Sequence, residues 1–84
     1  MYIRTQPRDI KVITAEQIKG WIEAGLPDAN VEVRGDDGVH FEAIVISPSF
    51  AGKSMLIQHR MVYETLGDRM KADIHALALQ TRAA

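Results

Sequence analysis

The sequence predicts an α+β fold in which a three-stranded mixed sheet carries helices on one face. Three features of the chain support this: a helix start signal at residue 14, a β-hairpin over residues 30–47, and a helix followed by a third strand over residues 55–81. A length of 84 residues allows one domain. We therefore take residues 1–84 as a single domain, with residues 1–12 as an irregular lead-in.

The first helix is predicted over residues 14–25. Thr14 at the N-cap and Gln17 three places later match a capping box, in which each side chain satisfies a backbone N–H that the helix start leaves free. Ile13 and Ile18 stand where a hydrophobic staple would place them. One apolar stripe then follows at helical spacing: Ile18, Trp21, Ile22 and Leu26.

A β-hairpin is predicted next. Residues 30–34 alternate apolar and polar side chains, and residues 39–47 are rich in β-branched and aromatic residues. The turn between them is predicted at Gly35 to Gly38, because glycine permits positive φ.

A second helix is predicted over residues 55–66, with Ser54 as its N-cap. Its apolar residues form a helical stripe: Met55, Leu56, Val62, Tyr63 and Leu66. Gly67 interrupts this helix, and a short helical turn is predicted at residues 68–71.

The last predicted element is a strand over residues 74–81. Alternation places two sets of side chains on opposite faces: His75, Leu77, Leu79 and Thr81 on one, and Ile74, Ala76, Ala78 and Gln80 on the other. The element order is therefore α-β-β-α-(α)-β. Because this strand follows a helical crossover, it can lie parallel to one strand of the hairpin.

The composition excludes several classes of protein. Ten basic and eleven acidic residues give a net charge of −1, unlike the strongly basic footprint of an obligate nucleic-acid binder. The absence of cysteine excludes disulfides, thiol nucleophiles and cysteine-only metal sites. A chain this short has a thin core, so we expect no enzyme. The longest apolar run, residues 43–46, is far below the roughly 20 residues of a membrane span. We expect a cytoplasmic protein without membrane contact.

Few local motifs carry chemistry on their own. Gly52-Lys53-Ser54 is similar to the end of a phosphate-binding P-loop, but Ser47 stands where that motif needs its first glycine. The segment is better interpreted as a loop with a helix cap.

The three histidines are the more informative residues. His59 lies on the stripe of the second predicted helix, which indicates a core-facing ring held neutral by a partner. His40 and His75 stand at the starts of predicted strands, where side chains can reach a partner protein. A hydrolytic zinc site made by all three is a weaker hypothesis, because no His-Glu-x-x-His spacing and no general base accompany them.

Five segments in the same order and spacing resemble the BolA family, with its small bacterial YrbA-like branch as the best match. The resemblance runs from about residue 14 to residue 81. The segments are Gly35-Asp36-Asp37-Gly38-Val39-His40-Phe41, Val45-Ile46-Ser47, Phe50-Ala51-Gly52-Lys53, His59-Arg60-Met61-Val62-Tyr63 and Ile74-His75-Ala76-Leu77.

This resemblance implies a fold similar to the class II KH domain and a non-enzymatic role beside a monothiol glutaredoxin, around a shared [2Fe–2S] cluster. It assigns one iron ligand to the histidine of the Ile-His-Ala-Leu motif, here His75. A second ligand is expected from the loop between the first two strands, which offers Asp36, Asp37 and, at its end, His40. We select His40.

Because this chain has no cysteine, it and its partner would supply different kinds of ligand. The chain alone is expected to bind no cluster, and a partner thiol and glutathione would supply the sulfur while this chain supplies imidazole. Histidine ligands raise the reduction potential of a [2Fe–2S] centre and must be unprotonated to bind. We expect such a cluster to bleach or rearrange below about pH 6, where a free imidazole protonates.

The resemblance also implies a second reading, because the family includes DNA-binding transcriptional regulators of stress or cell-envelope genes. A KH domain clamps nucleic-acid backbone with a Gly-x-x-Gly loop between its paired helices, and here only Gly67 stands there. Four basic residues are candidates for phosphate contact: Lys53, Arg60, Arg69 and Lys71. The expected oligomeric state is a monomer, or a weak homodimer paired through a free strand edge.

Overall fold

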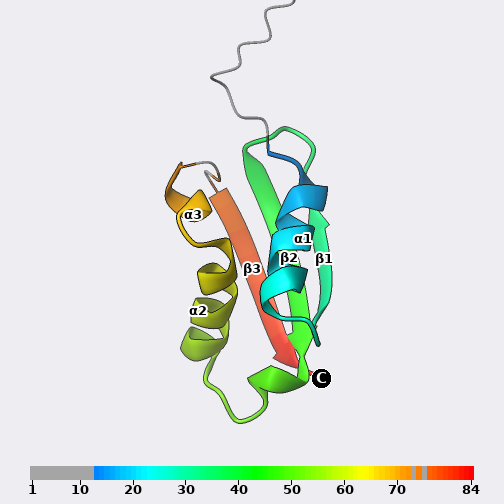
Figure 1. The fold of residues 1–84 in the computed structure, drawn as a ribbon, viewed down its shortest axis with the longest axis vertical. Coiled ribbons are helices and arrows are strands. Elements are labelled where there is room, and N and C mark those ends of the chain that lie inside the picture. The colour runs from blue at the N-terminus through cyan, green and yellow to red at the C-terminus, as the bar shows by residue number, and fades with distance from the viewer. Residues whose placement is uncertain (1–12, 73, 75) are drawn as a thin grey trace, which may run out of the picture.

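The computed structural model describes residues 13–72, 74 and 76–84, so the lead-in predicted for residues 1–12 lies outside the described residues. The elements follow the predicted order (Figure 1). They are α1 (Ala15–Gly25), β1 (Asn30–Arg34), β2 (His40–Ser47), the 3-10 turn η1 (Pro48–Phe50), α2 (Met55–Leu66), α3 (Arg69–Ala72) and β3 (Ala76–Ala83).

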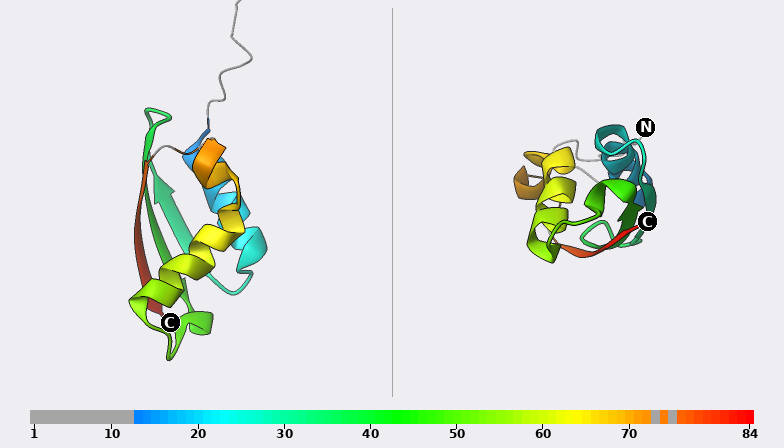
Figure 2. Two further views of the ribbon diagram at one scale, coloured as in Figure 1. Left: turned by 90° about the vertical axis from the view of Figure 1, so that its left-hand side faces the viewer. Right: turned by 90° about the horizontal axis from the view of Figure 1, so that it is seen from below.

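The three strands form one mixed sheet in the order β1-β2-β3. The hairpin strands β1 and β2 are antiparallel, and β3 runs parallel to β2. Both long helices lie on the same face of this sheet, and no described helix covers the other face (Figure 2). The predicted α+β class and the predicted parallel pairing are therefore confirmed. None of the described helices is long and apolar enough to cross a membrane.

The start of α1 has the predicted capping box. The backbone N–H of Gln17 donates to Thr14 Oγ1 at 3.2 Å, and the N–H of Thr14 donates to Gln17 Oε1 at 3.0 Å. Ile13 and Ile18, the two residues of the predicted staple, are both buried. Local sequence thus determines where this helix begins and which side it turns to the sheet.

The core lies between the helices and the sheet. From β2 it takes alternate residues, because successive side chains of a strand point to opposite faces. Phe50, the last residue of η1, is fully buried in this layer. The buried apolar residues are Ile13, Ile18, Ile22, Val31, Phe41, Ala43, Val45, Phe50, Val62, Leu66 and Ile74.

The buried side of α2 differs from the predicted stripe. Met55 and Leu56 are 55% and 66% exposed, and Tyr63 is also exposed, so their assignment to the core is wrong. Val62 and Leu66 are buried as predicted, and Gln58, four residues before Val62, is the third buried position. A polar residue can occupy this stripe because its hydrogen bonds are made inside the protein.

The side chain of Gln58 links the start of α2 to β3 through hydrogen bonds. Its Nε2 donates to the carbonyl oxygen of Lys53 at 2.9 Å, and its Oε1 accepts from Thr81 Oγ1 at 2.7 Å. The predicted cap is also present, since Ser54 Oγ accepts from the N–H of Ile57 at 3.2 Å. Two polar side chains therefore fix the helix against the last strand.

The last strand begins later than predicted. Ile74, the first residue of the predicted strand, precedes β3 in the structure: it is 2% exposed and donates its N–H to the carbonyl oxygen of Arg69 at 2.8 Å. Its apolar side chain thus belongs to the core and its N–H closes the turn after α3. The predicted alternation holds from Leu77 onward.

A polar cluster closes the C-terminal end of β2 at Ser47, which is its lower end in Figure 1. Ser47 Oγ and Ser49 Oγ donate to the two carboxylate oxygens of Asp28 at 2.8 and 2.6 Å, and Ser47 Oγ also accepts from the N–H of Ser49 at 2.9 Å. These hydrogen bonds lower the pKa of the Asp28 carboxyl, with Ser49 as the largest cause and Ser47 the next. The cluster joins the segment before β1 to η1.

Candidate functional site

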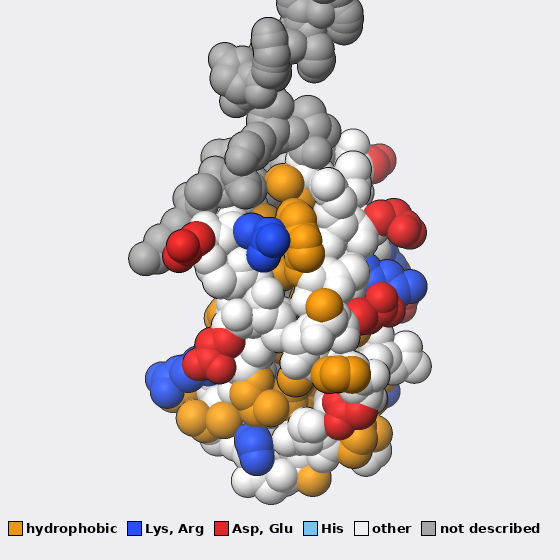
Figure 3. Space-filling model, viewed as in Figure 1, with side chains coloured by type: hydrophobic (Ala, Val, Ile, Leu, Met, Phe, Trp, Pro, Cys, Tyr) orange, Lys and Arg blue, Asp and Glu red, His pale blue; other side chains and the backbone are white. Residues whose placement is uncertain are grey.

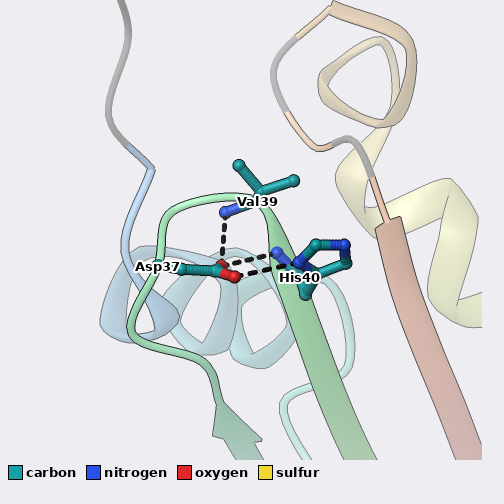
Figure 4. A network of polar contacts seen from close by, with 3 residues as sticks. All are labelled: Asp37, Val39 and His40. Atoms are coloured by element: carbon teal, nitrogen blue, oxygen red, sulfur yellow. Dashed lines mark hydrogen bonds and ion pairs between the residues drawn. The ribbon is translucent and has the colours of Figure 1, made fainter.

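The candidate site lies at the opposite end of β2, where the β1–β2 turn meets the first residue of the strand. Asp37 organises this turn (Figure 4). Its Oδ1 accepts from the backbone N–H groups of Val39 and His40, both at 2.8 Å, and its Oδ2 lies 2.9 Å from His40 Nδ1. The carboxylate is thus bound to the backbone on one side and to the imidazole on the other.

These contacts determine which nitrogen of His40 carries a proton. An ionised carboxylate can only accept hydrogen bonds, so Nδ1 must donate to Asp37. In the neutral ring, Nε2 then keeps its lone pair, which is the form in which histidine binds metals. The side chain of His40 is 75% exposed, so this lone pair is accessible from outside the protein.

The same contacts perturb the carboxyl group. The hydrogen bond from the His40 side chain holds the pKa of Asp37 well below its ordinary value of 3.8, and the backbone N–H groups of His40 and Val39 lower it further. Asp37 is 52% exposed, so no burial forces this arrangement. Local turn geometry produces it, because Asp side chains readily bond backbone groups two or three residues ahead.

The parallel pairing places the start of β3 beside His40. His40 is in register with Ala76, the first residue of β3, and the N–H of Ala76 donates to the carbonyl oxygen of Val39 at 3.2 Å. The predicted ligand His75, which precedes Ala76 in the chain, lies outside the described residues. Sequence alone does not determine the register of this pairing, and the structure gives it.

The environment of His59 differs from the predicted one. It is only half-buried and lines a surface groove of about 380 Å³ along α2, and its ring meets that of Tyr63 edge-on with 6.5 Å between centroids. Its Nε2 is buried without a hydrogen-bond partner among the described residues, which differs from the expected partnered ring. The groove is lined by Leu56, His59, Arg60, Tyr63, Glu64 and Gly67.

The described residues contain no group of three His, Cys, Asp or Glu side chains that could together hold a metal ion. His40 lies at the head of β2, whereas His59 is in the middle of α2. The weaker zinc hypothesis, which joins these two with His75, gains no support from the part of the chain that the structure describes.

The candidate basic residues do not converge on one point. Lys53 precedes α2, Arg60 lies in its middle, and Arg69 begins α3, so they follow a helix about 18 Å long. The guanidinium of Arg69 stacks on Trp21, 4.1 Å from the ring centroid. The side chain of Lys71 lies outside the described residues. On the helical face, Lys and Arg side chains are separated from one another, with Asp and Glu among them (Figure 3).

Sequence reasoning identified His40 but missed what Asp37 does to it. It treated Asp37 as an alternative ligand rather than as the partner of the ring. The signal was present in the spacing, because an Asp three residues before a His across a glycine turn can reach that ring.

Comparisons with known proteins agree with this architecture. The family model for "BolA-like protein" matches residues 23–84. The solved structure of a BolA protein homologue from Coxiella burnetii is 49% identical, with a TM-score of 0.76 over 84% of this chain and 91% of that one. Protein BOLA2 of Arabidopsis thaliana is 38% identical over 72 residues, which cover 82% of this chain and 76% of that protein.

A third relative carries a functional name. The DNA-binding transcriptional regulator BolA of Escherichia coli is 43% identical over 42 residues, which cover 50% of this chain and 40% of that protein. The chain spans 54% or less of the length of several curated relatives that it matches. The family model matches most of the chain, and the fold is similar to that of a solved BolA structure: the chain belongs to the BolA-like protein family.

Proposed function

We propose that this chain is a non-enzymatic accessory protein that partners a monothiol glutaredoxin and contributes imidazole ligands to a shared [2Fe–2S] cluster, for binding or transfer. The observation that carries the proposal is the exposure, hydrogen bonding and position of the His40 ring. Its ring is exposed, its Nδ1 is occupied by Asp37, and it stands beside the first residue of β3, the strand that follows His75 in the chain.

The donor set fits a shared cluster better than one held by this chain alone. Iron–sulfur clusters are bound chiefly by thiolates, and this chain has none. His40 offers a single accessible nitrogen, so in this proposal the other ligands are His75, which the family resemblance implies, and the thiols of the partner and glutathione. When bound, the cluster would supply electron-transfer or iron–sulfur cargo chemistry. This chain would orient one ligand and make binding depend on an unprotonated ring.

Co-expression with a monothiol glutaredoxin tests the proposal. We expect a coloured complex with [2Fe–2S] absorbance, which His75→Ala or His40→Ala weakens or abolishes. His59→Gln is the matched control, because it removes a histidine on α2 away from the turn, and it should leave the colour unchanged. A colourless wild-type complex, or equal colour in all three variants, would contradict the proposal.

The pH dependence gives a second test. Imidazole ligands should be lost as they protonate, so we expect the visible spectrum of the complex to bleach or change below about pH 6. An unchanged spectrum between pH 8 and pH 5 would count against histidine as a ligand.

The alternative function is DNA binding, which the name of the E. coli relative favours. It would use the basic residues along α2 and α3, and its affinity should fall steeply with salt. A mobility-shift assay at about 50 mM salt tests it. We expect Lys53→Ala and Arg60→Ala each to weaken binding if this function is correct, whereas His40→Ala should not. The absence of any shift would exclude it.

A further inference from the structure

The strongest feature outside the predicted ligands is the Asp37 carboxylate. Both of its oxygens are engaged: Oδ1 with the N–H groups of Val39 and His40, and Oδ2 with His40 Nδ1. Two of these three contacts are to the backbone, so the carboxylate does not depend on the ring for its own position. It is therefore fixed in the protein before any ligand arrives.

We propose that Asp37 is a positioning residue, which holds His40 as the Nδ1–H tautomer so that Nε2 is the atom that binds iron. This inference rests on the proposed function and deepens it. It names the ligand atom and a residue, not itself a ligand, on which that atom depends.

General metal-site chemistry supports this role. Metal-binding histidines almost always donate their other ring N–H to a carboxylate, a carbonyl or water, which fixes the tautomer and ring orientation and makes the ligand nitrogen more basic. In this turn the donor and acceptor lie 2.9 Å apart, a good hydrogen-bond distance. Nδ1 is therefore in use and faces the turn, which leaves Nε2 for a ligand outside the chain.

The backbone around the turn reinforces this arrangement. Gly35 has a φ of +150°, and a Cβ at this position would lie 2.6 Å from the carbonyl oxygen of His40 and 2.6 Å from Cδ1 of Phe41. The start of the turn thus packs directly against the backbone of the ligand residue. Asp36, adjacent and equally charged, has no hydrogen bond to His40 in the described structure. It is the natural control.

The first experiment reads the tautomer in the metal-free protein, by nitrogen-15 NMR of the imidazole rings at a pH where His40 is neutral. We expect a protonated Nδ1 and an unprotonated Nε2 for His40 in the wild type. In Asp37→Asn the single amide oxygen is held by the backbone N–H groups, so the amide NH₂ faces Nδ1 and should drive the proton to Nε2. Asp36→Asn, which removes the same charge, should leave the wild-type pattern. An unchanged tautomer in Asp37→Asn, or an equal change in Asp36→Asn, would overturn the proposal.

The second experiment uses the cluster-loaded complex of this chain with a monothiol glutaredoxin and glutathione. A chelator is added, and the half-life of the visible absorbance is measured. Because outer partners of metal ligands typically contribute 10–100-fold to affinity, Asp37→Asn should shorten the half-life by about that factor, and Asp36→Asn by less than about twofold.

The variants separate two kinds of failure. If His40→Ala shortens the half-life and Asp37→Asn does not, the positioning role is wrong while the proposed function stands. If His40→Ala has no effect but His75→Ala does, His40 is not a ligand and the role of Asp37 fails with it, although the glutaredoxin partnership survives. If the wild-type complex holds no cluster, the proposed function itself is wrong.

Discussion

The two ends of β2 are built alike but leave different groups free. At the lower end, Asp28 accepts from two serine hydroxyls, and Ser47 is fully buried. At the upper end, Asp37 accepts from His40, whose ring is 75% exposed and keeps one nitrogen without a partner in the turn. The lower cluster satisfies its polar groups internally and joins two segments. The upper one orients a ring toward the outside.

This difference predicts that the lower end of β2 contributes mainly to stability and the upper end mainly to ligand binding. Removal of a buried group that packs against others destabilises a protein, whereas removal of an exposed group changes its free energy of unfolding by less than about 0.5 kcal/mol. We therefore expect substitutions at the lower end to affect unfolding and side-chain substitutions at the upper end to affect ligand binding. The following predictions test this contrast, from the largest expected effect to the smallest.

The largest effect is expected for Phe50→Ala at the lower end. The ring is fully buried, so its loss should lower the free energy of unfolding by about 3–5 kcal/mol. Urea denaturation followed by circular dichroism measures this. His40→Ala is the counterpart at the upper end and should change the value by less than about 0.5 kcal/mol. Similar losses in the two variants would contradict the contrast.

The backbone at the upper end is the exception, and Gly35→Ala should reveal it. The new Cβ would clash with the backbone of His40 and the ring of Phe41, and φ is unfavourable for alanine. We expect a loss of about 1–3 kcal/mol in the same unfolding assay. Gly20→Ala is the control, because nothing lies within 4 Å of its Cβ in α1. It should raise stability by about 0.5–1 kcal/mol.

Ser47→Ala should have a moderate effect at the lower end. It removes the hydroxyl that donates to Asp28 and leaves the N–H of Ser49 without its acceptor. We expect the free energy of unfolding to fall by about 1–2 kcal/mol. Ser54→Ala, which removes the cap of α2, provides a comparison of about 1 kcal/mol. No loss in Ser47→Ala would show that the cluster does not join the two segments.

The smallest effects are expected in carboxyl titrations. Both Asp28 and Asp37 have lowered pKa values in the folded protein. Each should therefore stabilise the fold above its ordinary pKa of 3.8, and that contribution should be lost as pH falls below this value. NMR titration of the side-chain carboxyls should show Ser49→Ala raising the pKa of Asp28 only, and His40→Ala raising that of Asp37 only. An effect of either variant on the other carboxyl would show that the two ends are coupled.

Local signals in the sequence determined much of this molecule. The capping box at Thr14, the Ser54 cap and the glycine turn each act within a few residues, so their patterns predicted the boundaries of α1, α2 and the hairpin. The place of His40 at the start of a strand predicted that its side chain can reach a partner, and the family resemblance then led to its selection as a candidate ligand.

Other features depended on contacts between segments far apart in the chain. Gln58 is on the buried side of α2 because Thr81, 23 residues later, supplies its hydrogen bond. Ile74 lies before the strand because its side chain packs in the core and its N–H donates to the carbonyl oxygen of Arg69, the first residue of α3. Helical periodicity assigned Met55 and Leu56 to the core only because it cannot show which side of a helix a sheet will cover.

The element order and the helix starts could be predicted from the chain alone, because they follow from backbone hydrogen bonding and local spacing, whereas the candidate ligands were implied by the resemblance to the BolA family. The register that places Ala76 beside His40, and the contact that leaves only one nitrogen of that ring free, became known only from the folded structure. Strand register depends on side-chain packing across the whole sheet, so local spacing cannot predict it. The tautomer of His40 depends on the 2.9 Å contact between its Nδ1 and Asp37 Oδ2, which exists only in the folded turn.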